Sequence, residues 1–227
     1  MSETRARTHA VTDEAIARLR NRILQQTSQV IAVRGVDGCS LTAVASAAGC
    51  SIGMIQHHFQ TRDALVLASI AYRSEQATDE WQRVSEVVTD PIHRIGELLN
   101  FAVEGEESFA DAWGFWVQAY AVAPRNVEVQ NTIAVALQLW RSLFVTALEG
   151  ARDTGRISSD LDPDQLASYI VAAADGLAVQ ALGGFYGGGA STMRTTLYGL
   201  VAHLLRIDER ALWDGIESVP SDESSSQ

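Results

Sequence analysis

The sequence has no lysine and little cysteine, and its apolar runs are short. All 17 basic residues are arginine, which excludes a Walker phosphate loop, lysine Schiff-base chemistry and any lysine general base. Two cysteines, Cys39 and Cys50, are too few for a disulfide framework and lack the CxxC spacing of a thiolate metal site. No apolar run approaches the ~20 residues that cross a bilayer, and the polar N-terminal residues are unlike a signal peptide. We therefore expect a cytoplasmic protein with reduced cysteines.

Acidic residues dominate the 227-residue chain, whose formal net charge is −11. The charge is uneven, because residues 1–65 hold seven arginines and five acidic residues, a net charge of +2 that leaves −13 for the remaining 162 residues. The hydrophobic content of 47% is typical of a folded domain rather than a disordered chain. Any contact with a polyanion is therefore expected near the N-terminus.

Apolar residues recur at intervals of three and four, and strand-like alternation is nearly absent. This pattern predicts an all-α fold of about nine helices. Caps and stops place the helices at residues 13–34 (ended by Gly35), 41–49 (capped by Ser40), 52–58 (capped by Ser51), 61–88, from 90 onward, 106–123, 126–154, 164–182 and 191–205. The glycine run at 183–189 is expected to be a flexible connector, and residues 217–227 a disordered tail.

The two short helices between residues 40 and 59 cannot persist alone and must pack on the first helix. The expected inward positions are Ile16, Leu19, Ile23, Leu24 and Ile31 on the first helix, Leu41, Val44, Ala45 and Ala48 on the second, and Ile52, Ile55 and Phe59 on the third. The outward face of the third helix carries Gly53, Met54, Gln56, His57 and His58, without a carboxylate. A major-groove recognition helix needs such a face, although an ordinary helical corner would also present solvent-facing amides.

The stretch LTAVASAAGCSIGMIQHHFQTRDAL resembles the N-terminal signature of TetR-type transcriptional regulators. The stretch matches that signature at its glycines, its serine, its histidine-phenylalanine pair and the basic residue that follows. The similarity covers residues 31–65. The resemblance implies a DNA-binding domain over residues 1–60 and an effector-binding and dimerisation domain over residues 61–216. It also implies an operator of pseudo-palindromic double-stranded DNA as partner.

Carried over position by position, the resemblance implies a set of DNA-contacting residues. Ser40, Thr42 and Ser51 would touch phosphates; Ile52, Gly53, Met54 and His57 would lie nearest the bases; His58 and Arg62 would hold the backbone. Gln56 departs from the family pattern, in which a phosphate-binding tyrosine is usual. An amide can donate to a phosphate or read adenine, so this departure leaves the operator sequence open.

The paired histidines and the two cysteines raise two other possible roles, a metal site and a redox switch. Adjacent histidines on a helix point about 100° apart, so His57 and His58 are not expected to share a metal ion. Cys39 and Cys50 bracket the second helix, where oxidation would distort DNA binding, but buried free cysteines are mostly inert.

Aromatic residues spaced by three and four suggest either core packing or an apolar effector cavity between helices. The candidates for lining or orienting a ligand in such a cavity are His93, Trp113, Trp116, Gln118, Tyr120, Trp140, Phe144, Tyr169 and Asp175. The segment 175–177, DGL, resembles the C-terminal domain of the choline-responsive repressor branch of the family.

The last two expected helices have broad faces of small residues, including Ala172, Ala178 and Gly199. The pattern alone fits an internal hairpin, whereas the resemblance implies a homodimer that is built as a four-helix bundle.

The sequence has no GxSxG or HExxH motif and no paired carboxylates that stand out, so we expect no catalytic residues, no metal site and no cofactor. The predicted function is a ligand-responsive transcriptional regulator without enzyme activity. Repression is the direction that the resemblance implies, and activation stays open. The alternative is a helical small-molecule-binding protein or enzyme that retains the fold without binding an operator.

Overall fold

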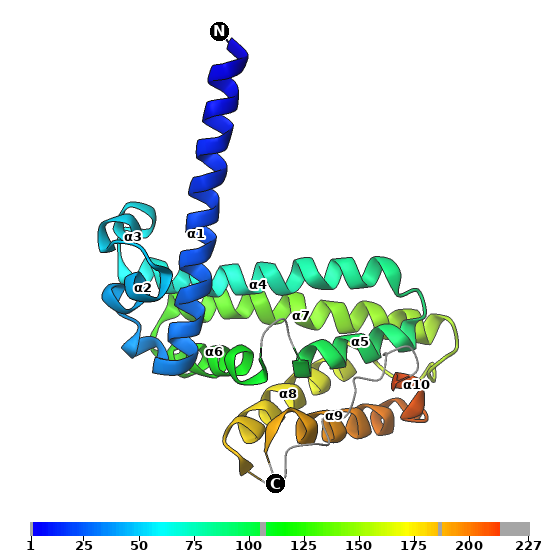
Figure 1. Ribbon diagram of the computed structural model, residues 1–227. Helices are drawn as coiled ribbons and strands as arrows, with labels where there is room; N and C mark the ends of the chain where they lie inside the picture. The colour runs from blue at the N-terminus through cyan, green and yellow to red at the C-terminus, as the bar shows by residue number, and fades with distance from the viewer. Residues whose placement is uncertain (1, 105–107, 186–187, 214–227) are drawn as a thin grey trace, which may run out of the picture.

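The computed structural model of the protein describes residues 2–104, 108–185 and 188–213, with side chains from residue 14 onward except residues 82–86. Within these ranges the chain is all-helical, which confirms the predicted fold class (Figure 1). The helices are α1 (Ser2–Gly38), α2 (Leu41–Ala48), α3 (Ile52–Phe59), α4 (Arg62–Val87), α5 (Pro91–Glu104), α6 (Phe109–Val122), α7 (Val127–Asp153), α8 (Pro163–Leu182), α9 (Gly189–Leu205) and α10 (Arg210–Trp213), with a 3₁₀ turn, η1 (Ala123–Arg125), between α6 and α7.

The capping residues begin and end the N-terminal helices where the sequence predicts. The Ser40 and Ser51 hydroxyls accept hydrogen bonds from the amides of Ala43 and Met54, at 3.1 and 3.2 Å. Gly49 ends α2 in the left-handed conformation, with φ 61° and ψ 41°. Each cap contributes about 1 kcal/mol, a large share of the stability of an eight-residue helix.

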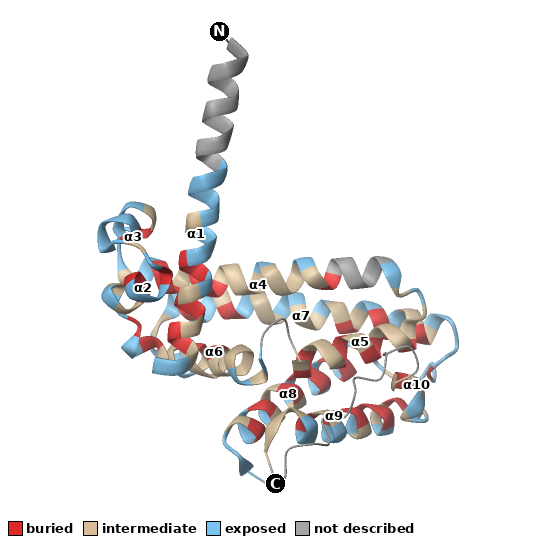
Figure 2. Cartoon of the chain, in the orientation of Figure 1, coloured by how far each residue is buried: buried red, intermediate tan, exposed pale blue. Residues whose placement is uncertain are grey.

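Helix α1 differs from the prediction at its N-terminal end. It begins at Ser2 rather than near residue 13 and runs past α3 (Figure 1), and residues 14–18 are exposed (Figure 2). Ile16 was predicted to face inward, but it is 47% exposed, because this part of α1 lies beyond the helices that cover Ile23, Leu24 and Ile31. The prediction for Ile16 is therefore wrong, and the last three residues are fully buried as expected.

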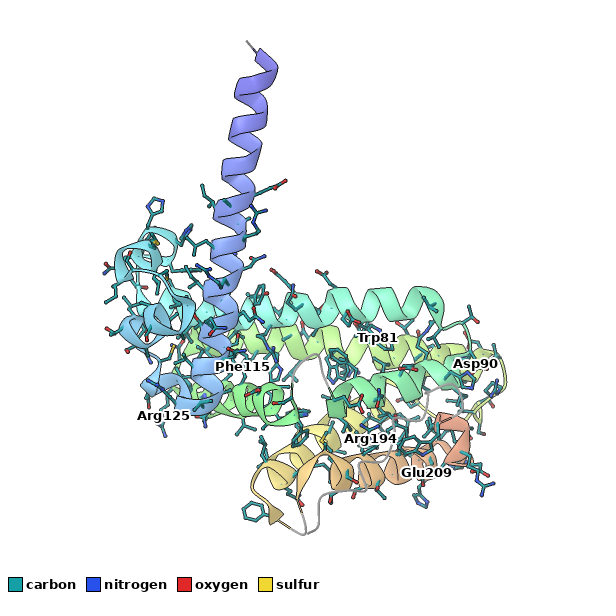
Figure 3. All side chains as sticks on the ribbon, in the orientation of Figure 1. Trp81, Asp90, Phe115, Arg125, Arg194 and Glu209 are labelled. Atoms are coloured by element: carbon teal, nitrogen blue, oxygen red, sulfur yellow. The ribbon has the colours of Figure 1, made fainter. Side chains whose placement is uncertain are left out.

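The buried residues form two clusters. One joins α1 to α2, α3 and the start of α4, and also includes Phe115 and Ala119 of α6. The other joins α5 to α7, α8 and α9, and includes Trp81 near the far end of α4. Figure 3 labels Phe115 and Trp81, one from each cluster. Burial of a side chain such as Phe115 contributes about 2–3 kcal/mol, so α6 is held firmly against the N-terminal helices.

Two aspartate-proline pairs start α5 and α8, close to the predicted residues 90 and 164. Asp90 accepts from the amides of Ile92 and His93, and Asp162 accepts from those of Asp164 and Gln165. The four-residue α10 was not predicted, because it is too short to show a helical period. Trp213 of α10 stacks on Tyr198 of α9 with ring centroids 4.1 Å apart. The predicted start at residue 106 and the predicted disordered tail at 217–227 lie outside the described residues.

Helices α7 and α8 have the length and the mean hydropathy, 1.2 in each, of membrane-spanning segments. Two such helices are weak evidence, because helices of soluble proteins meet the same criterion. Exposed positions on α7 carry polar residues such as Gln130, Asn131, Gln138 and Ser142, which a lipid-facing helix would avoid.

Candidate functional site

Helix α3 presents one buried and one exposed face. Ile55 and Phe59 are buried, and Gly53, Gln56 and His57 are exposed. Met54 is 49% exposed, a large apolar side chain in solvent beside a cap. Most of the residues that the resemblance places nearest the bases are thus exposed together on α3.

Ile52 lies on the exposed face, at 39% exposure, because it occupies the first turn of α3, beyond the reach of the core. Its predicted inward position is therefore wrong. The base-facing position that the resemblance implies for Ile52 stays a prediction, and the exposure is compatible with it.

The two histidines differ in their surroundings. His57 is exposed, whereas His58 is half-buried, with its ring centroid 5.5 Å from that of His57 and 6.1 Å from that of Phe59. The part of the chain that the structure describes holds no group of three or more His, Cys, Asp or Glu side chains placed to bind a metal ion.

Arg62 has a different environment from the one expected. Its Nε donates to the carbonyl of Cys39 at 2.8 Å, one terminal nitrogen donates to the carbonyl of Val36, and the other pairs with Asp63 at 3.1 Å. The guanidinium therefore ties the start of α4 to the link between α1 and α2. Each of its three nitrogens thus has a partner within the chain, which weakens the case for the phosphate contact that the resemblance implies for Arg62.

Both cysteines are free thiols, with Cys39 buried and Cys50 half-buried. Burial raises the pKa of the Cys39 thiol, although the nearby Arg62 acts in the opposite direction. A protonated buried thiol reacts slowly, so the geometry gives no support to a redox switch at Cys39.

A cavity of about 130 Å³ lies between α4, α5, α6, α7 and α8. It is lined by Arg73, Ser74, Ala77, Thr78, Phe101, Ala102, Ala112, Trp113, Trp116, Tyr120, Ala136, Leu137, Trp140, Leu143 and Asp175. Five of the nine predicted effector residues are among them, namely Trp113, Trp116, Tyr120, Trp140 and Asp175.

Five of the 15 lining residues are aromatic. Phe101 and Trp140 lie with ring centroids 5.7 Å apart, and Trp116 and Tyr120 lie 6.3 Å apart. The indole of Trp113 donates to the carbonyl of Ala102 at 2.8 Å, which fixes this ring between α6 and α5. The negative faces of such rings attract a cation that is stripped of its water.

Asp175 is the one carboxylate among the lining residues. The Tyr120 hydroxyl donates to its Oδ1 at 3.4 Å. Burial raises the pKa of Asp175 to about 6, and the hydrogen bond from Tyr120 acts in the opposite direction. Burial and the neighbouring Asp175 together raise the pKa of the Tyr120 hydroxyl, which therefore stays protonated and keeps donating.

Four predicted effector residues are not among those that line the cavity. Phe144 is fully buried and packs against Trp140, with ring centroids 5.2 Å apart, so the core-packing alternative holds for it. Tyr169 is 49% exposed on α8, His93 lies in the first turn of α5, and Gln118 packs against Gly35 of α1. Helical spacing puts these four residues on aromatic or polar stripes, but spacing alone does not determine which side of each helix faces the cavity.

The residues that sequence reasoning missed come mainly from α4 and α5. Ser74 and Thr78 lie one turn apart on α4. Phe101 was detectable in principle, because it lies off the apolar stripe that Ile95, Leu98 and Ala102 form on α5. A large aromatic side chain outside the core stripe is a sign of a second contact surface.

Two family models match the chain. Residues 23–69 match the model described as bacterial regulatory proteins of the tetR family, and residues 91–206 match that of the BetI-type transcriptional repressor, C-terminal. The second match alone spans half of the 227 residues.

Curated relatives are similar over most of the chain. The HTH-type transcriptional regulator PksA of Bacillus subtilis (strain 168) is 24% identical over 163 residues, which cover 72% of this chain and 78% of the relative. The HTH-type transcriptional regulator BetI of Rhizobium meliloti (strain 1021) is 20% identical over 161 residues, 71% of this chain and 76% of the relative.

Solved structures share the fold. A protein from Saccharomonospora viridis, described as a transcriptional regulator and solved in complex with choline, superposes with a TM-score of 0.76 at 24% identity, over 82% of this chain and 97% of that one. A TetR-family protein from Rhodococcus sp. superposes with a TM-score of 0.73 at 24% identity, over 83% and 99%.

Proposed function

The chain belongs to the TetR family of transcriptional regulators and has a BetI-type C-terminal domain, and from this premise we propose that it is a repressor released from its operator by an organic ammonium ion. The observation that carries the choice of effector is the cavity, whose lining includes five aromatic side chains and a single carboxylate. Its one cation, Arg73, has its guanidinium over the ring of Phe115, which does not line the cavity. In this proposal residues 1–60 bind DNA, residues 61–216 bind the effector and form a dimer, and the protein acts in the cytoplasm.

The exposed face of α3 supports the operator contact. Gly53 lets the helix approach the major groove closely, Met54 offers an apolar contact for a thymine methyl group, and Gln56 and His57 can hydrogen-bond to base edges or phosphates. Ser51 and Thr42 are exposed near the N-termini of α3 and α2, where helix dipoles favour a phosphate.

The cavity supports a cationic effector that is also partly apolar. Phe101, Trp116 and Trp140 offer ring faces, and the Asp175 carboxylate balances a positive charge that has lost its water. The choline complex of the Saccharomonospora viridis protein is in keeping with this chemistry, because choline carries a quaternary ammonium group. Tyr120 orients the carboxylate, since its hydroxyl donates to Asp175.

Helices α4 and α6 are suited to transmit binding to the DNA-binding helices. Both line the cavity, and both also contact α1: α4 through Arg62, and α6 through Gly114 and Gln118. A Cβ atom on Gly114 would lie 3.4 Å from the Ala32 carbonyl, so the two helices are closely packed. An effector that favours a different placement of α6 would therefore displace α1, and with it α3.

A homodimer through α8 and α9 is part of the proposal. The outward face of α8 carries Tyr169, Ala172, Gly176 and Val179, spaced by three and four, and that of α9 carries Leu200. Small residues between two larger apolar ones allow two helices to approach closely. A two-fold axis there would present two α3 helices to successive major grooves.

The effector is tested by calorimetry with choline and with its neutral isostere 3,3-dimethyl-1-butanol. The proposal predicts heat of binding for choline or a tetraalkylammonium ion and at least tenfold weaker binding of the neutral alcohol. It also predicts that the cation releases a DNA fragment taken from upstream of the gene. Equal binding of the cation and the alcohol would contradict a cationic effector. It would not affect the proposed operator contact, which DNA binding tests separately.

A further inference from the structure

The surface that faces DNA in the proposed function carries no formal charge. Residues 40–61, which hold α2, α3 and their caps, contain no arginine, lysine, aspartate or glutamate. The next basic residue, Arg62, donates to carbonyl groups of its own chain. DNA binding depends strongly on the neutralisation of phosphates by cations, and the effector domain is strongly acidic. The cations must therefore come from another part of the N-terminal domain.

The projecting part of α1 supplies them beside α3. Arg18 and Arg22 are exposed, and their spacing of four residues puts them on one face of the helix. That face borders an open groove of about 950 Å³, which Ser46, Ser51 and Met54 also line. Arg18 and Arg22 thus lie on the side of α1 that faces the start of α3. Helix α1 continues past α3 (Figure 1).

Contacts within the domain hold this part of α1 in place and leave the two arginines available. The guanidinium of Arg20 lies 5.4 Å from the centroid of the Phe59 ring, which links α1 to the end of α3. Arg18 pairs with Glu14 at 3.2 Å, but the two side chains are 68% and 71% exposed. An ion pair this exposed contributes little and exchanges easily for a phosphate.

We propose that Arg18 and Arg22 bind backbone phosphates of the DNA that flanks the base pairs contacted by α3. The groove between α1 and the α2–α3 turn would then receive one sugar-phosphate strand, with the arginines on one wall and the Ser46 and Ser51 hydroxyls on the other. Glu14 would oppose this contact, because its carboxylate competes with the phosphate for Arg18. This inference rests on the proposed function and adds a second DNA-contacting element to it.

The test compares the salt dependence of DNA binding by the full chain and by the variant Arg18→Gln/Arg22→Gln. Fluorescence anisotropy with an upstream fragment is measured between about 50 and 300 mM salt. Each lost phosphate contact reduces the slope of log K against log salt by about 0.9, so the slope is expected to become less steep by about 1.8 per subunit. The preference for the upstream fragment over a scrambled one is expected to persist, because phosphate contacts carry no sequence information.

Three further variants sharpen the result. Arg18→Lys/Arg22→Lys keeps both charges and should keep the slope, and Arg210→Gln removes one charge at the opposite end of the molecule and should change nothing. Glu14→Gln should strengthen binding. An unchanged slope in the double glutamine variant, with wild-type binding intact, would overturn the inference and leave the proposed function standing. If the wild-type protein binds no fragment, the proposed function fails, and this inference fails with it.

Discussion

At the residue scale, the arginines in and beside the DNA-binding helices have two different environments. Arg62 is half-buried and donates to the carbonyls of Val36 and Cys39, where α1 ends and α2 begins. Arg18 and Arg22 are exposed on the projecting part of α1. The sequence motif shows only that Arg62 is basic. The surrounding backbone shows that its guanidinium hydrogen-bonds to the carbonyls between α1 and α2.

Replacing Arg62 with alanine is expected to destabilise the fold. The change removes hydrogen bonds from a charged donor and leaves two carbonyls without that partner, at a cost of about 2–3 kcal/mol. Urea unfolding followed by circular dichroism should show a lower midpoint with an unchanged m-value. The slope of DNA affinity against salt should stay at the wild-type value; a slope reduced by about 0.9 with full stability would instead assign Arg62 to a phosphate.

Asp175 is expected to make cation binding depend on pH. Its folded pKa of about 6 lies above the ordinary 3.8, so the folded chain binds this proton more tightly than the unfolded chain does. The buried carboxyl therefore costs stability as the pH rises from about 4 to about 6. Its ionisation in the folded chain is centred at about pH 6 and favours a bound cation.

Choline affinity is accordingly predicted to rise between pH 5 and pH 7.5 and then to level off. In Asp175→Asn, binding should be at least tenfold weaker at pH 7.5 and nearly independent of pH, while thermal stability at pH 7.5 should increase. Calorimetry at both pH values checks the affinity. Tight, pH-independent binding by the wild-type protein would contradict the role given to this carboxylate.

At the scale of elements, the contact between α1 and α6 connects the cavity to the DNA-binding helices. Gly35 has φ 73° and ψ 167°, a conformation that side chains with a Cβ atom rarely adopt. A Cβ atom there would also lie 2.9 Å from Oε1 of Gln118 on α6. The glycine therefore lets α1 turn sharply while α6 lies against it.

Gly35→Ala is predicted to lower the free energy of unfolding by about 1–3 kcal/mol, because the backbone strain cannot be relieved by moving a side chain. Adding Gln118→Ala should recover only the smaller part that arises from the steric contact. Urea unfolding of the two variants and of Gln118→Ala alone separates the contributions. Full recovery in the double variant would mean that the backbone conformation at Gly35 carries no strain.

The sequence predicts the helices well and their faces less well. Caps such as Ser40, Ser51 and Asp162 act locally, so α2, α3 and α8 begin where these residues stand. Burial depends on neighbours that are distant in the sequence, and for that reason Ile16 and Ile52 were misplaced. In the cavity, Trp116 and Trp140 were anticipated from their spacing, whereas Ser74 and Phe101 depend on how α4 and α5 pack against α6 and α7.

At the scale of the whole molecule, the outward faces of α8 and α9 support a dimer, and Tyr169 belongs to this face rather than to the cavity. Ala172→Glu places a charge in the middle of the face without disturbing the helix backbone. Light scattering at micromolar concentration should give a dimer mass for the wild-type protein and a monomer mass for this variant. The matched change Ala64→Glu, at an exposed site in the first turn of α4, should leave the dimer intact.

The central claim is that the chain recognises a specific operator, and the most direct measurement is the ratio of its affinities for upstream and scrambled DNA at 150 mM salt. Specific regulators bind their sites about 10³-fold or more tightly than other DNA. Anisotropy titrations are predicted to give a ratio of this size for the wild-type protein and a ratio near one for His57→Ala/Gln56→Ala, since these side chains lie exposed on α3. Equal affinity of the wild-type protein for the two fragments, or no binding to either, would contradict the account.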